Sequence, residues 1–323
     1  MNADPAPQDV GGWFASHTFH HRDFPVGALL ARKDALRQRV TVVIPTLNEA
    51  ATIAGIVRTI REELTGPGGL VDELHVIDSG STDGTRELAA AAGAAVHLAS
   101  AIRPDIISPG GKGENLWKAG IVSQADIFCF IDGDIQNFEA YFVSGLLGPL
   151  LMDPSLLFAK AFYERPLAPG GVAPDPGGGR VTEILIRPMF SLFFPELCGI
   201  IQPLSGEYAM RRSLHQTLAF PSGYGVEAAH LVDIARMHGI GVMAQVDLEH
   251  RLHRVRGTPE LGYMACRILQ SLWPRLPARA HAGAPADTRY HGIAWDGSAY
   301  QRQAQALADI ELPPQMEEFG PPA

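Results

Sequence analysis

Residues 40–53 carry the sequence VTVVIPTLNEAATI, in which an apolar run ends at a proline and polar residues follow. The run Val40–Ile44 is typical of a buried strand, and Pro45 marks its end. A helix is expected from Asn48 to about Leu64, because apolar residues recur there at helical spacing on one face. A buried strand followed directly by an amphipathic helix is typical of an α/β fold.

The same alternation of strand and helix continues to residue 134. Strands are expected at Glu73–Ile77, Ala95–Leu98 and Ile127–Ile131, and helices at Thr85–Ala92 and Glu114–Gln124. Short connections between such elements predict an α/β fold with a Rossmann-like, mostly parallel central sheet. Beyond residue 134 the pattern predicts strands at Leu156–Tyr163, Gly206–Met210 and Gly241–Val246, and helices at Tyr141–Met152, Val181–Phe194, Gly225–His238 and Tyr300–Ile310.

The 323 residues include 26 basic and 35 acidic side chains, a formal net charge of −9. A nucleic-acid-binding protein needs a basic face to neutralise phosphates, so this class is not expected. Cys129, Cys198 and Cys266 are odd in number and far apart, which fits neither a disulfide framework nor a zinc site and favours a reducing compartment. The sequence shows no secretory leader pattern and no apolar stretch long enough to cross a bilayer, so we expect a cytoplasmic protein without membrane contact.

Polar residues follow three of the expected strands: Pro45–Glu49, Asp78–Gly84 and Asp132–Asp134. The carboxyl ends of parallel strands meet at one edge of a sheet, and ligands of α/β proteins bind there. Glu49 and Asp78 are placed to hydrogen-bond the ribose and base of a nucleotide. Capped turns would explain each segment alone, but not the same chemistry at three successive strand ends.

The segment Asp132-Gly133-Asp134 predicts a metal site. Alternation along an extended segment turns the two carboxylates the same way, and Gly133 lets a ligand approach the backbone. Two carboxylates at a strand end suit Mg²⁺ or Mn²⁺ bound to a diphosphate. Taken alone, the segment is also typical of a solvated acidic turn, so this prediction depends on the neighbouring strand ends.

Three histidines near the N-terminus, His17, His20 and His21, are residues of a metal-ligating type. Surface side chains are the commoner use of histidines in an arm of this composition. A metal site there is therefore the weaker of two interpretations.

An anion site is expected in the second half of the chain. Gly177-Gly-Gly-Arg180-Val-Thr182 begins a predicted helix, and the bare amides of a helix N-terminus bind anions. Arg180 adds a planar fork of donors, Thr182 adds a hydroxyl, and Arg256 would supply a second cation. A flexible linker would explain Pro166–Gly177, but less well the abrupt junction that follows it.

Several strings of the sequence resemble known families. VTVVIPTLNEAATI, VIDSGSTDGT, GGKGENLW and IDGD resemble the GT-A fold of nucleotide-sugar glycosyltransferases. DSGSTDGT, GKGENLW, GGGRVTE, QPLSGEYAMRR, GYGVE and HRLHRVR resemble, more narrowly, the glucosyl-3-phosphoglycerate synthases. Any one of these strings is weak, but six in order from about Phe14 to Gln270 are specific.

The resemblance implies a retaining transfer of glucose from UDP-glucose to the 2-hydroxyl of 3-phospho-D-glycerate, aided by Mg²⁺ or Mn²⁺. It implies that the nucleotide sugar is bound by Pro45, Thr46, Leu47, Glu49, Ser79, Lys112, Asp132, Gly133 and Tyr224. It implies that Asp134 and His253 bind the metal, that Glu227 and Asp134 are catalytic, and that Glu227 binds the hydroxyls of the glucose. It further implies a homodimer and an acceptor site formed by Gly179, Arg180, Thr182 and Arg256.

On this interpretation residues 13–273 form the GT-A catalytic domain, with a nucleotide-sugar half at about 38–135 and an acceptor half at about 136–273. Residues 1–12 are expected to be disordered, and residues 274–323 to form a partly helical tail. For Glu227 the alternative is a charge that merely favours the start of a helix, and for His253 it is a surface side chain among arginines.

Three rival functions stay open. Mannosyl-3-phosphoglycerate synthesis from GDP-mannose is the nearest, because related enzymes share most of these motifs. Transfer to a lipid phosphate is disfavoured because an apolar anchor is missing from the sequence, and a non-catalytic nucleotide-sugar-binding protein is disfavoured by the intact set of site residues.

Lys112 is followed by glycine rather than Ser or Thr, so Gly110-Gly-Lys-Gly is not a P-loop, and a dinucleotide fingerprint does not follow the first strand.

Overall fold

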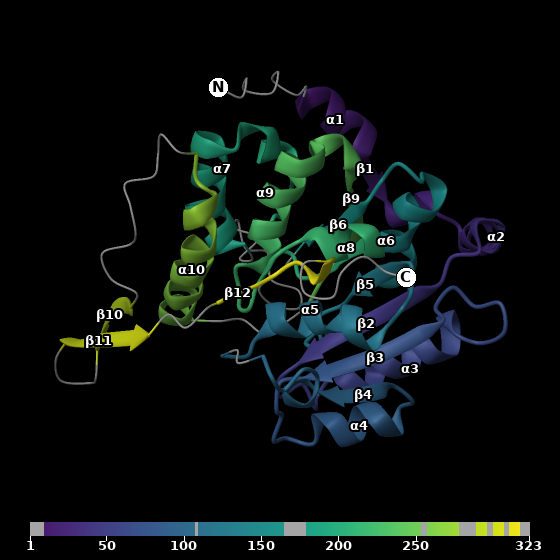
Figure 1. The fold of residues 1–323 in the computed structure, drawn as a ribbon, viewed down its shortest axis with the longest axis horizontal. Coiled ribbons are helices and arrows are strands. Elements are labelled where there is room, and N and C mark those ends of the chain that lie inside the picture. The colour runs from purple at the N-terminus through teal and green to yellow at the C-terminus, as the bar shows by residue number, and fades with distance from the viewer. Residues whose placement is uncertain are drawn as a thin grey trace.

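A computed structural model describes residues 10–106, 109–164, 179–252, 257–277, 289–295, 300–306 and 310–316. Its main feature is a sheet of eight strands, in the spatial order β1-β9-β6-β7-β5-β2-β3-β4 (Figure 1). In that order, the strands span Thr18–His20, Met243–His250, Phe158–Glu164, Tyr208–Arg211, Ile127–Phe130, Val40–Thr46, Glu73–Asp78 and Ala95–Leu98.

One strand runs against the others. β7 is antiparallel to both of its neighbours, β5 and β6, whereas every other adjacent pair in this sheet is parallel. The expectation of a mostly parallel sheet is confirmed. Because of the reversed strand, the amino end of β7 lies at the same edge as the carboxyl ends of β2, β3, β5, β6 and β9.

Helices cover both faces of the sheet (Figure 1). The helices span Val10–His17 (α1), Val26–Leu36 (α2), Ile53–Leu64 (α3), Thr85–Ala91 (α4), Lys112–Val122 (α5), Tyr141–Met152 (α6), Arg187–Phe193 (α7), Arg212–Thr217 (α8), Val226–His238 (α9) and Thr258–Leu272 (α10). Short 3₁₀ segments lie at His21–Asp23, Ala99–Ala101, Pro195–Gly199, Ile240–Val242 and Trp273–Arg275, and a π turn lies at Thr182–Ile186.

Alternation along the strands divides the apolar residues between two cores. Val42 and Ile44 of β2 pack with α2, α3 and α6 on one face. Val43, between them, packs on the other face with α5, α7, α9 and α10. A strand whose side chains are buried on both faces reads as a continuous apolar run, and for this reason β2 is evident from the sequence.

The helix expected to begin at Asn48 begins at Ile53 instead. Asn48 has a left-handed backbone, with φ of +60°, and its N–H donates to Ser81 Oγ at 2.8 Å. The N–H of Glu49 donates to Thr85 Oγ1 at 2.8 Å. The backbone after β2 is therefore held by Ser81 and Thr85, which follow β3, and it passes through a turn that starts at Glu49 before the helix begins.

Both chain ends differ from expectation. Residues 10–12, expected to be disordered, belong to α1; residues 1–9 lie outside the described residues. The helix expected at Tyr300–Ile310 is wrong, because Tyr300–Ala306 forms strand β11, antiparallel to β10 at Arg289–Trp295 (Figure 1). Pairing along seven residues supplies backbone hydrogen bonds that outweigh the helical preference of the Ala and Gln residues there.

The last described residues pack back onto the domain. β12, at Glu311–Leu312, pairs with β8 at Phe220–Pro221. Trp117 Nε1–H donates to the carbonyl of Pro313 at 2.9 Å, and Gln315 Nε2 donates to the carbonyl of Trp117 at 2.7 Å. This part of the expected tail therefore contacts α5.

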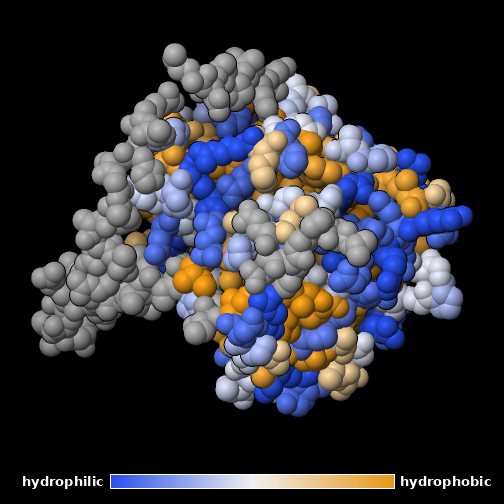
Figure 2. Space-filling model, in the orientation of Figure 1, coloured by the Kyte–Doolittle hydropathy of each residue, from blue (hydrophilic) through white to orange (hydrophobic). Residues whose placement is uncertain are grey.

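The described helices include none with the length and apolar character needed to cross a bilayer. Figure 2 shows one face of the molecule, on which hydrophilic residues are interspersed with smaller apolar areas.

Candidate active site

Asp78, at the end of β3, holds two loops together. Its side chain is fully buried and accepts hydrogen bonds from the hydroxyls of Thr46 and Ser81 and from the N–H groups of Gly80 and Ser81. The expectation that Asp78 contacts a nucleotide is wrong, because its carboxylate has no exposed surface. The Thr46 hydroxyl is likewise turned toward Asp78, at 2.9 Å.

The segments predicted to hold a nucleotide come together beside this loop. Asn115 of α5 donates from Nδ2 to Ser79 Oγ at 2.8 Å. A Cβ built on Gly133 would lie 3.2 Å from Cγ of Glu49, so the turn after β5 packs closely against the segment after β2. Leu47 is 55 % exposed at this edge. The structure thus brings Pro45–Glu49, Ser79 and Gly133 to one place.

Lys112, the first residue of α5, lies between two carboxylates. Its Nζ forms ion pairs with Asp132, after β5, and with Glu227 in the first turn of α9, at 2.8 Å from the latter. Burial disfavours the charge on Lys112, but the carboxylates around it outweigh burial and raise the pKa of Lys112 well above its usual value. Lys112 therefore stays protonated at any physiological pH.

The two carboxylates of the Asp-x-Asp segment point the same way, as predicted. Nη2 of Arg251 lies 2.7 Å from Asp134 Oδ1 and 3.1 Å from Asp132 Oδ2. A Cβ built on Gly206 would lie 2.1 Å from Asp132 Oδ2 and 2.3 Å from Lys112 Nζ, so only a glycine leaves room for this cluster. One cation is thus already accommodated where both aspartates can reach it.

Sequence reasoning missed Arg251, Glu207 and Lys160, all of which are at most 4 % exposed. Glu207 directly precedes β7, accepts a hydrogen bond from the Tyr163 hydroxyl and lies 3.1 Å from Arg251 Nε. Lys160 of β6 donates to the carbonyl of Ser205 at 2.6 Å. Charged residues inside an apolar strand and just before another strand were the available signals.

The pKa values of these groups differ from their usual ranges. Burial lowers the pKa of Lys160 to about 7, although the nearby Glu227 acts to raise it. Burial raises the pKa of Glu207, and the guanidinium of Arg251 opposes that shift. Burial disfavours the charge on Arg251, but Glu207, Tyr163, Asp134 and Asp132 together outweigh burial and raise the pKa of Arg251 above its usual value.

The charges described here suit a divalent cation. Four carboxylates (Asp132, Asp134, Glu207 and Glu227) lie together with three basic side chains, Lys112, Arg251 and Lys160. Hard oxygen donors with a surplus of negative charge are what Mg²⁺ and Mn²⁺ prefer. His253 and Arg256, also predicted for this site, lie outside the described residues.

Comparison with known proteins shows the family to which the chain belongs. Residues 41–163 match the model of glycosyl transferase family 2. A glucosyl-3-phosphoglycerate synthase from Petrotoga mobilis is 44 % identical over 260 residues, which are 80 % of this chain and 80 % of that protein. The chain belongs to the glucosyl-3-phosphoglycerate synthase family.

Solved structures of related enzymes share the whole fold. The mannosyl-3-phosphoglycerate synthase of Rubrobacter xylanophilus has a TM-score of 0.87 at 32 % identity, covering 97 % of this chain and 99 % of that one. The glucosyl-3-phosphoglycerate synthase of Mycobacterium tuberculosis, in complex with Mn²⁺, UDP-glucose and phosphoglyceric acid, has a TM-score of 0.80 at 36 % identity, covering 94 % and 98 %. The predicted GT-A fold is confirmed.

The residues that family resemblance assigns to the acceptor begin a helical segment. Gly179 has φ of +85°, and its carbonyl accepts the N–H of Glu183 at 2.9 Å. Arg180 follows, and Thr182 is buried where the π turn begins. Tyr224, just before α9, lies with its ring 5.4 Å from the guanidinium carbon of Arg267. Their roles in this member of the family remain predictions.

Two of the three N-terminal histidines form a cluster with Glu249 beside the edge strand β1. Nε2 of His21 and Nε2 of His20 lie 3.2 and 3.6 Å from Glu249 Oε1, whereas His17 pairs with Ser16. Arg22 also forms an ion pair with Glu249. His20 Nδ1 accepts the N–H of Arg22, which leaves the proton of a neutral ring on Nε2. The cluster is thus already satisfied by hydrogen bonds and an ion pair.

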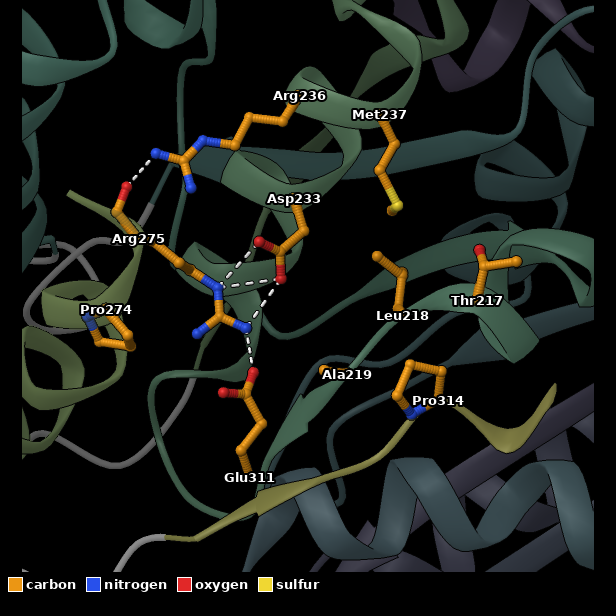
Figure 3. A pocket seen from close by; sticks show the side chains of 10 residues that line it. All are labelled: Thr217, Leu218, Ala219, Asp233, Arg236, Met237, Pro274, Arg275, Glu311 and Pro314. Atoms are coloured by element: carbon orange, nitrogen blue, oxygen red, sulfur yellow. Dashed lines mark hydrogen bonds and ion pairs between the residues drawn. The ribbon is translucent and has the colours of Figure 1, made fainter. Parts of the chain in front are cut away.

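A pocket of about 400 Å³ lies near the far end of α9 from Glu227 (Figure 3). Arg275 projects across it and pairs with Asp233, at 2.8 Å, and with Glu311. Arg236 donates to the carbonyl of Arg275. These contacts connect β12 to α9, so the pocket belongs to the packing of the tail rather than to the charged cluster.

Proposed function

We propose that this chain is a glucosyl-3-phosphoglycerate synthase that transfers glucose from UDP-glucose to the 2-hydroxyl of 3-phospho-D-glycerate with retention of configuration. The observation that carries the proposal is the convergence of Lys112, Asp132, Asp134 and Glu227 at the edge where β2, β3 and β5 end. At that edge the loops after β2 and β3 lie beside a cluster of charged side chains of the kind that a sugar diphosphate and its cation need.

The uridine would lie against Pro45–Glu49 and Ser79. The N–H groups of Asn48 and Glu49 are fixed by Ser81 and Thr85, so the segment is ordered before a ligand arrives. Leu47, already 55 % exposed, offers an apolar surface for the base. Preordering of this kind reduces the entropy that binding must overcome.

Asp134 and His253 would hold the Mg²⁺ or Mn²⁺, with Asp132 and Gly133 beside the diphosphate. The cation, when bound, stabilises the negative charge that develops on the departing diphosphate. Lys112, charged and directed at the same place, stabilises that charge as well.

Glu227 and Tyr224 would orient the transferred glucose. Glu227 forms an ion pair with Lys112 at 2.8 Å. This contact orients the carboxylate so that it can accept hydrogen bonds from sugar hydroxyls. We assign no protein base, because attack on the same face as the departing diphosphate lets a phosphate oxygen assist the incoming hydroxyl.

Phosphoglycerate would be bound by Gly179, Arg180, Thr182 and Arg256. A left-handed glycine that exposes its backbone, followed by a guanidinium and a hydroxyl, supplies donors for a phosphate or a carboxylate. The acceptor is thereby brought in from the second half of the chain, opposite the nucleotide.

A homodimer and a cytoplasmic location complete the proposal. Ile184 and Leu192, in the helical segment after Arg180, are 78 % and 68 % exposed, and an apolar surface of this kind suits a second copy. Both substrates carry phosphate groups, which keeps them within the compartment that makes them. Light scattering during gel filtration tests the dimer.

Mannosyl-3-phosphoglycerate synthesis from GDP-mannose is a second candidate, because a neighbour bearing that activity in its name has the TM-score of 0.87. Purified protein with Mg²⁺ and 3-phosphoglycerate is offered UDP-glucose or GDP-mannose separately, and release of nucleoside diphosphate is measured. Acceptor-dependent release from UDP-glucose supports the proposal, and release from GDP-mannose alone moves the protein to the second candidate. Binding of either donor without release would indicate a nucleotide-sugar-binding protein.

A further inference from the structure

Glu207 is a fully buried carboxylate behind the Asp-x-Asp segment, and none of the roles above uses it. Glu207 directly precedes β7. Its hydrogen-bond donor, Tyr163, lies in β6. Burying a carboxylate is costly unless it is paired, so a buried glutamate beside a charge cluster calls for a reason.

Arg251 is shared among three carboxylates. Its Nη2 lies 2.7 Å from Asp134 and 3.1 Å from Asp132, while its Nε lies 3.1 Å from Glu207 Oε1. The last contact is an ion pair without hydrogen-bond alignment, so Nε and Oε1 are both buried without an aligned partner. The guanidinium is thus drawn toward the aspartates and away from good geometry with Glu207.

A divalent cation on Asp134 would change this balance. The cation needs the carboxylate that Arg251 now contacts, and two cations that share one carboxylate repel each other. Glu207 offers a buried acceptor to Nε, the donor next to Nη2 on the same edge of the guanidinium. A small shift of Arg251 toward Glu207 would align Nε with Oε1 and leave Asp134 to the metal.

We propose that Glu207 is a positioning residue, which draws the Arg251 guanidinium away from Asp134 and so keeps that carboxylate available to the divalent cation. The inference rests on the proposed role of Asp134 as a metal ligand. Glu207 itself does not touch the metal or the substrates; it acts through Arg251.

Tyr163 fixes both members of the pair. Its hydroxyl donates to Glu207, and its ring lies 5.6 Å from the guanidinium carbon of Arg251. The ring and the hydroxyl therefore hold the arginine and the glutamate beside each other. Residues that orient metal ligands in this indirect way commonly change metal affinity by roughly 10–100-fold when they are replaced.

The test is the Mn²⁺ affinity of Glu207→Gln, measured from the EPR signal of free Mn²⁺ with protein and saturating UDP present. Glutamine keeps the shape but loses the charge, so Arg251 stays on Asp134, and we expect Mn²⁺ to bind roughly 10–100-fold more weakly. Asp233→Asn is the matched control, because Asp233 is also a carboxylate paired with a buried arginine, Arg275, but lies in the remote pocket of Figure 3. Its Mn²⁺ affinity should equal that of the wild type.

An unchanged Mn²⁺ affinity in a folded Glu207→Gln protein would overturn the proposal. If that variant does not fold, Tyr163→Phe decides instead, since it removes one donor to Glu207; a several-fold loss of Mn²⁺ affinity supports the proposal and an unchanged affinity overturns it. Asp134→Ala separates this inference from the proposed function. Wild-type Mn²⁺ affinity in Asp134→Ala would refute the metal site itself, whatever Glu207→Gln does.

Discussion

Asp78 and Lys160 are both buried charged side chains of the same sheet, in the nucleotide-sugar and acceptor halves respectively. Asp78 accepts hydrogen bonds from two hydroxyls and two N–H groups, and Nε of Arg86 lies 3.7 Å from its Oδ1. Lys160 donates to one carbonyl, its Nζ lies 5.1 Å from the centre of the Tyr208 ring, and it interacts electrostatically with charges such as Glu227 and Lys112. These short-range contacts make the charge of Asp78 stabilising. Burial of Lys160, in contrast, lowers the stability of the folded state.

Asp134 lies where the two halves meet, so its replacement should have the largest effect on activity. We expect Asp134→Ala to lower kcat/KM by roughly 10³–10⁴-fold, because several kcal/mol of stabilisation of the developing charge depend on the cation. Nucleotide release in the presence of Mg²⁺ measures it, with Glu62→Ala, an exposed carboxylate of α3, as the control. Turnover near the wild-type rate, or wild-type turnover that survives EDTA, would contradict the metal role.

Asp78→Ala tests the nucleotide-sugar half. It leaves four donors without their acceptor in a buried place, so we expect the free energy of unfolding to fall by roughly 3–5 kcal/mol. Urea unfolding measures it, and Asp105→Ala, an exposed aspartate paired with Arg103, is the control. A loss below about 1 kcal/mol would mean that water replaces the carboxylate and that the loops are not held by Asp78.

Lys160→Met tests the acceptor half. We expect this variant to raise the free energy of unfolding, whereas Asp78→Ala should lower it. Burial lowers the pKa of Lys160 from its usual 10.5 to about 7, so at pH 6 the folded state carries a buried ammonium that unfolding would release into water. We expect the variant to be more stable by roughly 2–3 kcal/mol at pH 6, after allowing for the lost hydrogen bond to Ser205.

The pH dependence distinguishes this charge effect from packing. Between pH 7 and 10.5 the unfolded lysine keeps a proton that the folded one has released, so the wild type gains stability as pH rises. The difference between Lys160→Met and wild type should therefore narrow by at most about 1.4 kcal/mol per pH unit above pH 7. Urea unfolding at pH 6, 7.5 and 9 measures it, and a constant difference would assign the effect to packing.

The sequence predicts the features of the fold and the site that depend on local patterns. The parallel strands β2, β3 and β5 are apolar runs with polar residues at their carboxyl ends, and both signals are local. Because ligand sites of such sheets lie at carboxyl ends, the strand pattern predicts Asp132 and Asp134 as site residues, and the family resemblance adds Lys112. The strand pattern also led to Asp78, where a turn-forming carboxylate looks the same as one directed at a ligand.

The missed residues depend on contacts that no local pattern contains. Glu207 lies at the amino end of β7, which reaches the site only because β7 is antiparallel, and its partner Tyr163 is 44 residues away. Arg251 meets Asp134 across 117 residues. The helix expected at Tyr300–Ile310 failed for the same reason, since pairing with β10 decides its structure.

Arg180→Ala should have the smallest effect of these substitutions. It tests whether residues of the acceptor half bind only the acceptor. Loss of one guanidinium on a phosphate or carboxylate costs about 1.5 kcal/mol or more, so we expect the KM for 3-phosphoglycerate to rise roughly tenfold or more while the KM for UDP-glucose stays unchanged. Initial rates with each substrate varied in turn measure both values. Arg180→Lys should fall between, because it keeps the charge and loses the planar fork. Arg58→Ala, an exposed arginine of α3, is the control. Equal changes in both KM values would place Arg180 outside the acceptor site and would mean that the two halves of the sheet do not divide the substrates between them.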